Sequence, residues 1–198
     1  MPAKLTNKTI AWLILILLAL IWGSSFILMK KGLLAYPPDQ MAAIRISISF
    51  LSLAIIVIKD FKKLEKKYYL PIAASGICGN GIPAFLFATA QTVVSSSIAG
   101  IMNSLTTAFT LMIGVLFFKA SKSWLRTLGV ILGLSGAVLL VVFANNGSMG
   151  TFSVYALMIV AATIGYATSV NIIRFKLKNI PSLHITAFAF ARSMSLPN

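Results

Sequence analysis

The sequence predicts an all-α membrane protein, a polytopic bundle of transmembrane helices, on three observations. First, 59% of its 198 residues are hydrophobic, only 10% are charged, and the mean hydropathy is +0.95. A soluble domain carries about a quarter charged residues, so there is too little polar surface here to cover a water-soluble globule. Second, apolar runs of about 20 residues, long enough to span a bilayer, alternate with short charged segments. Third, these runs are apolar on all sides, unlike the alternating strands of about ten residues in a membrane β-barrel.

The apolar runs predict six full spans and a partial seventh. The first, Ile10–Met29, has spanning length rather than signal-peptide length, so we expect an uncleaved anchor. Pro37, Pro38 and Asp39 suit the start of the second, because proline is tolerated in the first helical turn and an acid complements the helix dipole. The remaining predicted spans are Pro38–Ile58, Tyr68–Ala90, Ile98–Phe118, Leu125–Phe143 and Phe152–Ile173, with the partial seventh beginning at Pro181.

The basic residues between the spans predict a multi-pass protein of the cell membrane with a cytoplasmic N-terminus. The formal net charge is +14, from 17 Lys and Arg against 3 acids. Apart from Lys30 and Lys31, the loop cations fall on the side of the N-terminus, and positive loops stay in the cytoplasm. Those cations are Lys4, Lys8, Lys59, Lys62, Lys63, Lys66, Lys67, Lys119, Lys122, Arg126, Arg174, Lys176 and Lys178. No basic face with interleaved aromatic residues is present, so we expect no nucleic-acid partner.

The residues predict no enzyme, no cofactor and no metal site. His184 is the single histidine, and Cys78 lies alone in an apolar run as a small hydrophobic residue. The acids Asp39, Asp60 and Glu65 lie in loops or at helix ends. No carboxylate pair, nucleophile with a base, or metal-ligand spacing can be assembled from this set.

Polar residues within or beside the spans are the candidates for lining a substrate cavity. Glycines and prolines interrupt the third span around Asn80, and irregular backbone in lipid is tolerated only against protein or a water-filled cavity. A close helix contact through small residues is the alternative explanation. Arg45 lies about two turns inside the second span, where it either reaches back to the interface or faces a cavity. The other candidates are Trp22, Ser24, Ser25, Gln91, Asn103 and Thr107.

Four segments, taken in order along the chain, resemble the EamA-like branch of the drug/metabolite transporter superfamily. They are similar to its first helix, its second helix, its third-to-fourth helix junction and its fifth helix: Leu20–Phe26, Pro38 with Arg45, Ala90–Gly100 and Leu128–Leu140. Two positions depart from the family pattern. Thr107 stands where a proline is usual, and Lys119-Ala120 stands where a Gly-Glu pair usually ends the fourth helix.

The resemblance implies two five-helix repeats of inverted topology, and this sequence supplies the first, residues 10–143, and an incomplete second, residues 152–198. It implies a permease or exporter, embedded in the lipid bilayer, for small polar metabolites such as amino acids, working by alternating access at the repeat interface. Because no carboxylate lies within a span, we expect facilitated or exchange movement. The alternative is a truncated, transport-inactive fragment, or half of an assembly completed by a homodimer partner or by the missing second half.

Overall fold

The structure, a computed structural model, describes residues 7–60, 65–118, 124–144, 151–178, 180–181, 184–186 and 188–189. Every regular element in these residues is helical, as the sequence predicts. The elements are α1 (Asn7–Gly32), α2 (Pro38–Asp60), η2 (Lys66–Tyr68), α3 (Tyr69–Gly76), η3 (Ile77–Gly81), α4 (Ile82–Ala90), α5 (Ser96–Asn103), α6 (Leu105–Phe118), α7 (Trp124–Ala144) and α8 (Thr151–Lys176).

The described helices overlap each of the six full spans predicted from the sequence. Four segments of the described residues are long and apolar enough to cross a membrane: Lys8–Gly32, Tyr69–Ala90, Ser96–Phe118 and Val154–Lys176. Helices α2 and α7, of 23 and 21 residues, cover the second and fifth predicted spans. The total of six crossings and the repeat architecture stay predictions. The seventh span and the loop residues Lys4, Lys62, Lys63, Lys119, Ala120 and Lys122 lie wholly or largely outside the described residues.

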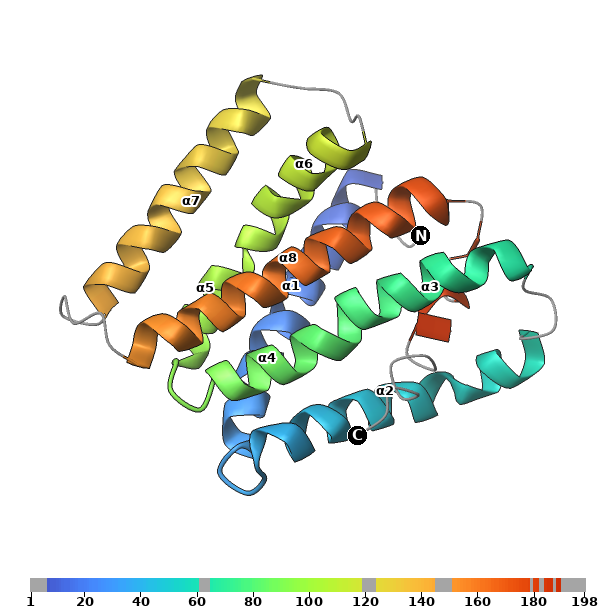
Figure 1. Cartoon of the computed structure of the whole chain (residues 1–198), viewed down its shortest axis with the longest axis horizontal. Coiled ribbons are helices and arrows are strands. Elements are labelled where there is room, and N and C mark those ends of the chain that lie inside the picture. Colours follow the sequence, from blue (N-terminus) through green and yellow to red (C-terminus); the bar gives the residue numbers. More distant parts are fainter. Residues whose placement is uncertain are drawn as a thin grey trace, which may run out of the picture.

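Helix α8 runs through the middle of the bundle (Figure 1). The α3–η3–α4 span lies along one side of it and α6 lies along the other, and α8 contacts each of them. Helix α7 packs against α6 at one edge, and α2 packs against α4 at the opposite edge. The helix that follows the first predicted repeat is therefore the one that joins its parts.

The third span is one long helix with a π-helical turn, η3, in its middle. Pro83 follows this turn closely, and a proline ring clashes with the carbonyl four residues earlier, here that of Gly79. An extra residue in the turn relieves such a clash, which is a common origin of π-helical bulges. Helical geometry then continues through α4 to Ala90.

Helix α8 packs closely against this irregular turn. A Cβ atom added to Gly165 would lie 2.7 Å from the carbonyl oxygen of Cys78, and one added to Gly79 would collide with the hydroxyl of Ser169. Ser169 also donates a hydrogen bond of 2.8 Å to the carbonyl oxygen of Ser75. Gly79 and Gly165 therefore permit close packing of the two helices, and the hydroxyl of Ser169 hydrogen-bonds the backbone beside the irregular turn.

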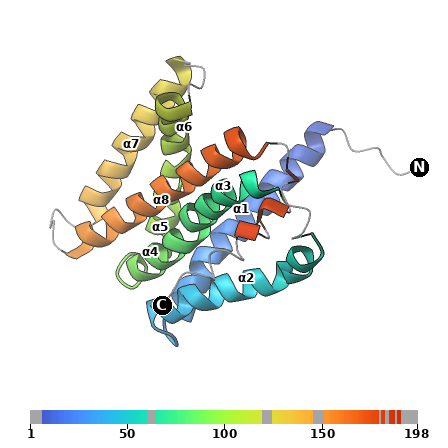
Figure 2. The same ribbon diagram turned by 45° about the vertical axis from the view of Figure 1, so that its right-hand side comes forward.

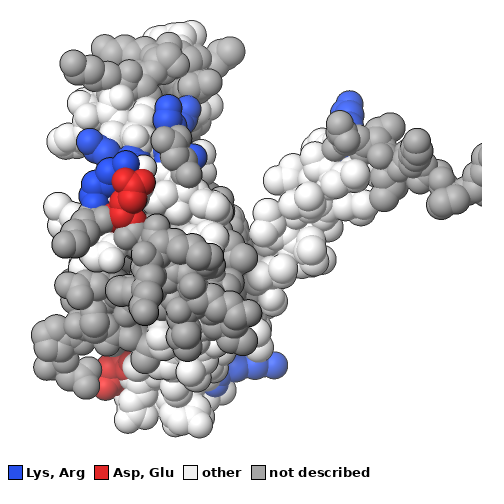
Figure 3. All heavy atoms as spheres, turned by 90° about the vertical axis from the view of Figure 1, so that its right-hand side faces the viewer, with Lys and Arg blue, Asp and Glu red and all other residues white. Residues whose placement is uncertain are grey.

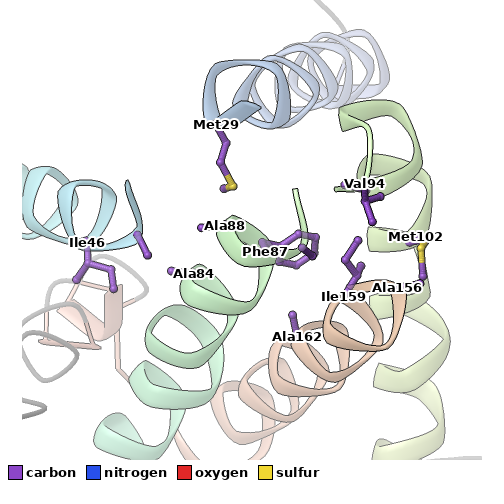
Figure 4. Packing of buried hydrophobic residues seen from close by; sticks show 13 residues of the cluster. Met29, Ile46, Ala84, Phe87, Ala88, Val94, Met102, Ala156, Ile159 and Ala162 are labelled. Carbon is purple, nitrogen blue, oxygen red and sulfur yellow. The ribbon is translucent and has the colours of Figure 1, made fainter. Parts of the chain in front are cut away.

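A hydrophobic core forms around Phe87 where α1, α2, α4, α5 and α8 meet (Figure 4). The ring of Phe87 lies 5.6 Å from that of Phe26 and 5.8 Å from that of Tyr166, between ring centroids. Such tilted pairs are the arrangement that aromatic quadrupoles favour. The buried members of the core are Met29, Ala42, Ile46, Ala84, Phe87, Ala88, Ala90, Val94, Ala99, Met102, Ala156, Ile159 and Ala162.

The N-terminal part of α1 stands away from the other helices (Figures 2 and 3). Every side chain from Lys8 to Ser24 is exposed, and none of the most apolar window of this helix is buried. From Ser25 onward the helix joins the bundle, where the hydroxyl of Ser96 donates a 3.1 Å hydrogen bond to the carbonyl oxygen of Phe26. The exposed part of α1 is an apolar surface that no described residue of this chain covers.

Candidate functional site

Two of the polar residues predicted from the sequence, Arg45 and Gln91, meet at the sulfur atom of Met29. Met29 lies near the end of α1 and points toward α4 (Figure 4). The side-chain nitrogen Nε2 of Gln91 donates to its sulfur over 3.1 Å, and a guanidinium nitrogen of Arg45 lies 3.9 Å from the same sulfur. The end of α1, the second turn of α2 and the end of α4 thus meet at these side chains. Met29, Arg45 and Gln91 together form the group around Met29.

Gln91 is held in place through its main chain as well as its side chain. The ammonium group of Lys30, in the last turn of α1, donates to the carbonyl oxygens of Gln91, Thr92 and Val94 at 2.5, 3.3 and 3.4 Å. These carbonyls follow the C-terminus of α4, where the helix dipole favours a cation. Lys30 therefore ties α1 to the loop that carries Gln91.

The polar atoms of this group are incompletely satisfied. Met29 and Gln91 are 1% and 0% exposed, and the buried amide oxygen Oε1 of Gln91 has no hydrogen-bond partner among the described residues. Arg45 is half-buried, and the Met29 sulfur is its one hydrogen-bond partner within the described residues. A thioether is a weak acceptor, so neither donor has a partner of its own strength.

The charge of Arg45 is not neutralised by an acid within the described side chains. Glu65 pairs with Lys67 over 2.7 Å in the loop before α3, where this hydrogen bond raises the pKa of Lys67. Asp39 is exposed in the first turn of α2. The group around Met29 is therefore a cationic site, and an anion or a zwitterion would complement it.

The structure does not bring the other predicted residues to this group. Trp22 is 61% exposed on the outlying part of α1, and the hydroxyl of Ser24 donates to its own helix at Ile21, 3.0 Å away. Asn80 is half-buried in the π-helical turn. The remaining candidates lie elsewhere on α1 and at the α5–α6 junction: Ser25, Asn103 and Thr107.

Asn103 and Thr107 flank a break between two helices. The oxygen Oδ1 of Asn103 accepts a 3.5 Å hydrogen bond from the hydroxyl of Thr106, and Thr107 is exposed. The α-helix is interrupted at Ser104, whose hydroxyl donates to the carbonyl oxygen of Ile101 over 2.6 Å. The fourth predicted span is thus two helices, α5 and α6, with polar residues at their junction.

Sequence reasoning missed three residues that the structure makes prominent. Met29 and Lys30 were treated as the end of an apolar run and as a loop charge, and nothing in their spacing shows that they contact Gln91. Asn171 is buried in α8 and donates to the carbonyl oxygen of Thr110 on α6 over 3.0 Å. An amide so deep in an apolar run is itself a signal of an interhelical hydrogen bond, because in lipid such a group needs a partner.

Within the described residues, no three His, Cys, Asp or Glu side chains are placed to hold a metal ion. The polar groups that converge on Met29 are an amide and a guanidinium, which are donors suited to carboxylate or phosphate oxygens.

Comparison with known proteins gives one family match. Residues 9–142 match the EamA-like transporter family. An uncharacterized transporter of Archaeoglobus fulgidus is 25% identical over 129 residues, which are 65% of this chain and 46% of that protein. The uncharacterized inner membrane transporter YedA of Escherichia coli is 27% identical over 155 residues, 76% of this chain and 48% of that protein.

A third relative covers a similar share of the chain. The uncharacterized transporter YdfC of Bacillus subtilis is 23% identical over 142 residues, 71% of this chain and 46% of that protein. The chain spans about half the length of the curated relatives it matches. No solved structure matches it.

Proposed function

Because this chain belongs to the EamA-like transporter family, we propose that it acts in a membrane permease or exporter for small polar metabolites such as amino acids. The observation that carries the proposal is the polar group around Met29. An amide and a guanidinium meet there, and no acid among the described side chains neutralises the guanidinium. Polar groups that are expensive to keep in a membrane interior are typical of solute pathways.

The proposed mechanism is alternating access between two sides of the membrane, with the N-terminus in the cytoplasm. The group around Met29 lies at the same end of the helices as the loop between α1 and α2. Lys31, in the last turn of α1 beside that loop, is extracytoplasmic in the orientation that the positive charges favour. The group would then be the outward end of the pathway, and Asn80, Asn103 and Thr107 remain proposed lining residues for the rest of it.

The exposed part of α1 favours a second candidate, in which this chain is half of an assembly. Its exposed apolar surface includes Trp22, which is 61% exposed. A helix with such a surface packs against lipid or against another protein. By analogy with the family, the protein that packs against α1 would be a second five-helix half or a second copy of this chain. Single-cysteine crosslinking along α1 in native membranes tests it: disulfide-linked dimers confined to one face of α1 support a second copy, and a uniform absence of crosslinks opposes it.

Exchange in proteoliposomes tests the transport proposal. Vesicles that contain the purified chain are loaded with an unlabelled amino acid and diluted into the same labelled amino acid. Saturable accumulation above that of protein-free vesicles supports the proposal, with a full-length member of the family as the positive control. Background accumulation of every metabolite tested, despite correct insertion of the chain, would reject it.

A further inference from the structure

Met29 occupies the position where a stronger hydrogen-bond acceptor would be expected. Its sulfur is the common partner of Gln91 Nε2, at 3.1 Å, and of a guanidinium nitrogen of Arg45, at 3.9 Å. Both are good donors, and a guanidinium in particular matches the paired oxygens of a carboxylate. A thioether offers a single weak acceptor and no charge.

The amide oxygen Oε1 of Gln91, in contrast, is an acceptor that lacks a donor. Oε1 is buried and accepts no hydrogen bond from any described residue, and an acceptor left unpaired in a protein interior carries a substantial free-energy cost. The side chain is not free to turn outward to water, because its residue is fully buried and Lys30 holds its carbonyl oxygen. In native proteins such an acceptor is usually paired with an ordered water or a bound ligand.

A single ligand can satisfy these atoms without a separate donor such as water only if it carries both an anionic and a cationic group. A lone anion would satisfy Arg45 and Nε2 of Gln91 but leave Oε1 unpaired. A lone cation would satisfy Oε1 but would be repelled by the positive charge of Arg45, which no described acid neutralises. A zwitterion with a carboxylate and an ammonium on neighbouring atoms satisfies all of them at once.

We propose that Met29 is a placeholder for the zwitterionic headgroup of an α-amino acid. On binding, the flexible methionine side chain moves aside, the carboxylate accepts hydrogen bonds from Arg45 and from Gln91 Nε2, and the ammonium donates to Gln91 Oε1. The inference rests on the transport function proposed above and specifies the substrate headgroup and the residues that recognise it. Lys30 contributes by fixing the position of Gln91.

The direct test is binding by the purified chain in nanodiscs of phosphatidylcholine, which carries no primary ammonium group to compete. The probes are radiolabelled leucine, methionine and threonine, and the competitors are their methyl esters and the corresponding decarboxylated amines. Loss of the carboxylate should weaken binding by about tenfold or more, the effect of losing one charge-assisted hydrogen bond. Repeating the titration with added phosphatidylethanolamine shows whether a lipid headgroup competes for the same site.

Variants locate the binding site. R45Q and Q91L should each weaken binding of the free amino acid by about tenfold, with R45K falling between R45Q and the unchanged chain. M29A should bind more tightly than the unchanged chain, because no side chain then competes with the headgroup. M102A is the matched control, and it should leave affinity unchanged. Met102 is equally buried in the same core, and its sulfur accepts no hydrogen bond among the described residues.

The outcomes separate this inference from the function on which it rests. Equal binding of amino acids and their esters, or unchanged affinity in a folded R45Q, would overturn the headgroup assignment and leave the transporter proposal standing. No saturable binding of any probe would also overturn the headgroup assignment, and the exchange measurement in proteoliposomes would then decide the transport function separately. The comparison of amino acid with ester needs no variant, so it decides the question even if a substitution prevents folding.

Discussion

Ser169 on α8 donates its hydroxyl to the main-chain carbonyl of Ser75 over 2.8 Å, which joins α8 to the span that contains the π-helical turn. S169A removes the donor from a buried position, so we expect the free energy of unfolding to fall by about 0.5–1.5 kcal/mol. Reversible unfolding in mixed micelles measures it. T168V is the control, because Thr168 bonds only its own helix, at Ile164, 2.9 Å away. Equal losses in the two variants would contradict the interhelical role of Ser169.

The close contact between α8 and the π-helical turn leaves no room for a side chain at Gly165. In G165A the new Cβ would lie 2.7 Å from the carbonyl oxygen of Cys78, so α8 must shift, and we expect destabilisation of about 1–3 kcal/mol. G129A is the matched control, since nothing lies within 4 Å of a Cβ at Gly129. The same unfolding measurement compares the two. If G165A is as stable as G129A, the close approach of the two helices is not needed.

Lys30 is expected to stabilise the fold by bonding the carbonyls beyond α4. K30M removes three hydrogen bonds from a partly buried ammonium, and the expected loss is about 1 kcal/mol after allowance for its remaining exposure. K31M is the control, because Lys31 is exposed in the same turn. Thermal unfolding in detergent distinguishes them. A smaller loss of stability for K30M than for K31M would contradict the role of Lys30 in positioning Gln91.

Proton coupling is not expected from this chain. The acids within the described residues lie at helix ends or in the loop before α3, which leaves no carboxylate in the middle of a span to carry a proton. Accumulation in vesicles should therefore follow the substrate gradient and respond little to an imposed pH gradient. Uptake driven by the pH gradient in vesicles that contain this chain alone would contradict the expectation.

The sequence predicted helix positions well because lipid imposes a strong constraint on composition. A segment that crosses a membrane must be apolar along its length, and proline and turn residues mark its ends, as at Pro38. It could not predict how the helices pack, because runs that are apolar on all sides do not show which face meets a neighbour. The central position of α8 and the π-helical turn before Pro83 are consequences of packing and came only from the structure.

The same reasoning explains what was predicted of the site. Arg45 and Gln91 were identified because polar groups in or beside an apolar run stand out in any sequence. Met29 was not, because a methionine among leucines and isoleucines carries no such signal. Trp22, Ser24 and Asn103 were chosen on the same grounds as Arg45, and the structure places them away from it, so their role as lining residues stays a prediction.

Substrate uptake by membrane vesicles that contain the unchanged chain or R45Q measures whether the chain transports amino acids and whether Arg45 takes part. Insertion is verified for both by protease protection, and T168V is carried as the control. We expect saturable uptake of amino acids by the unchanged chain and by T168V, with a loss of about tenfold in R45Q. Correct insertion without saturable uptake, or equal uptake by R45Q, would contradict the claim that this family member moves amino acids past the group around Met29.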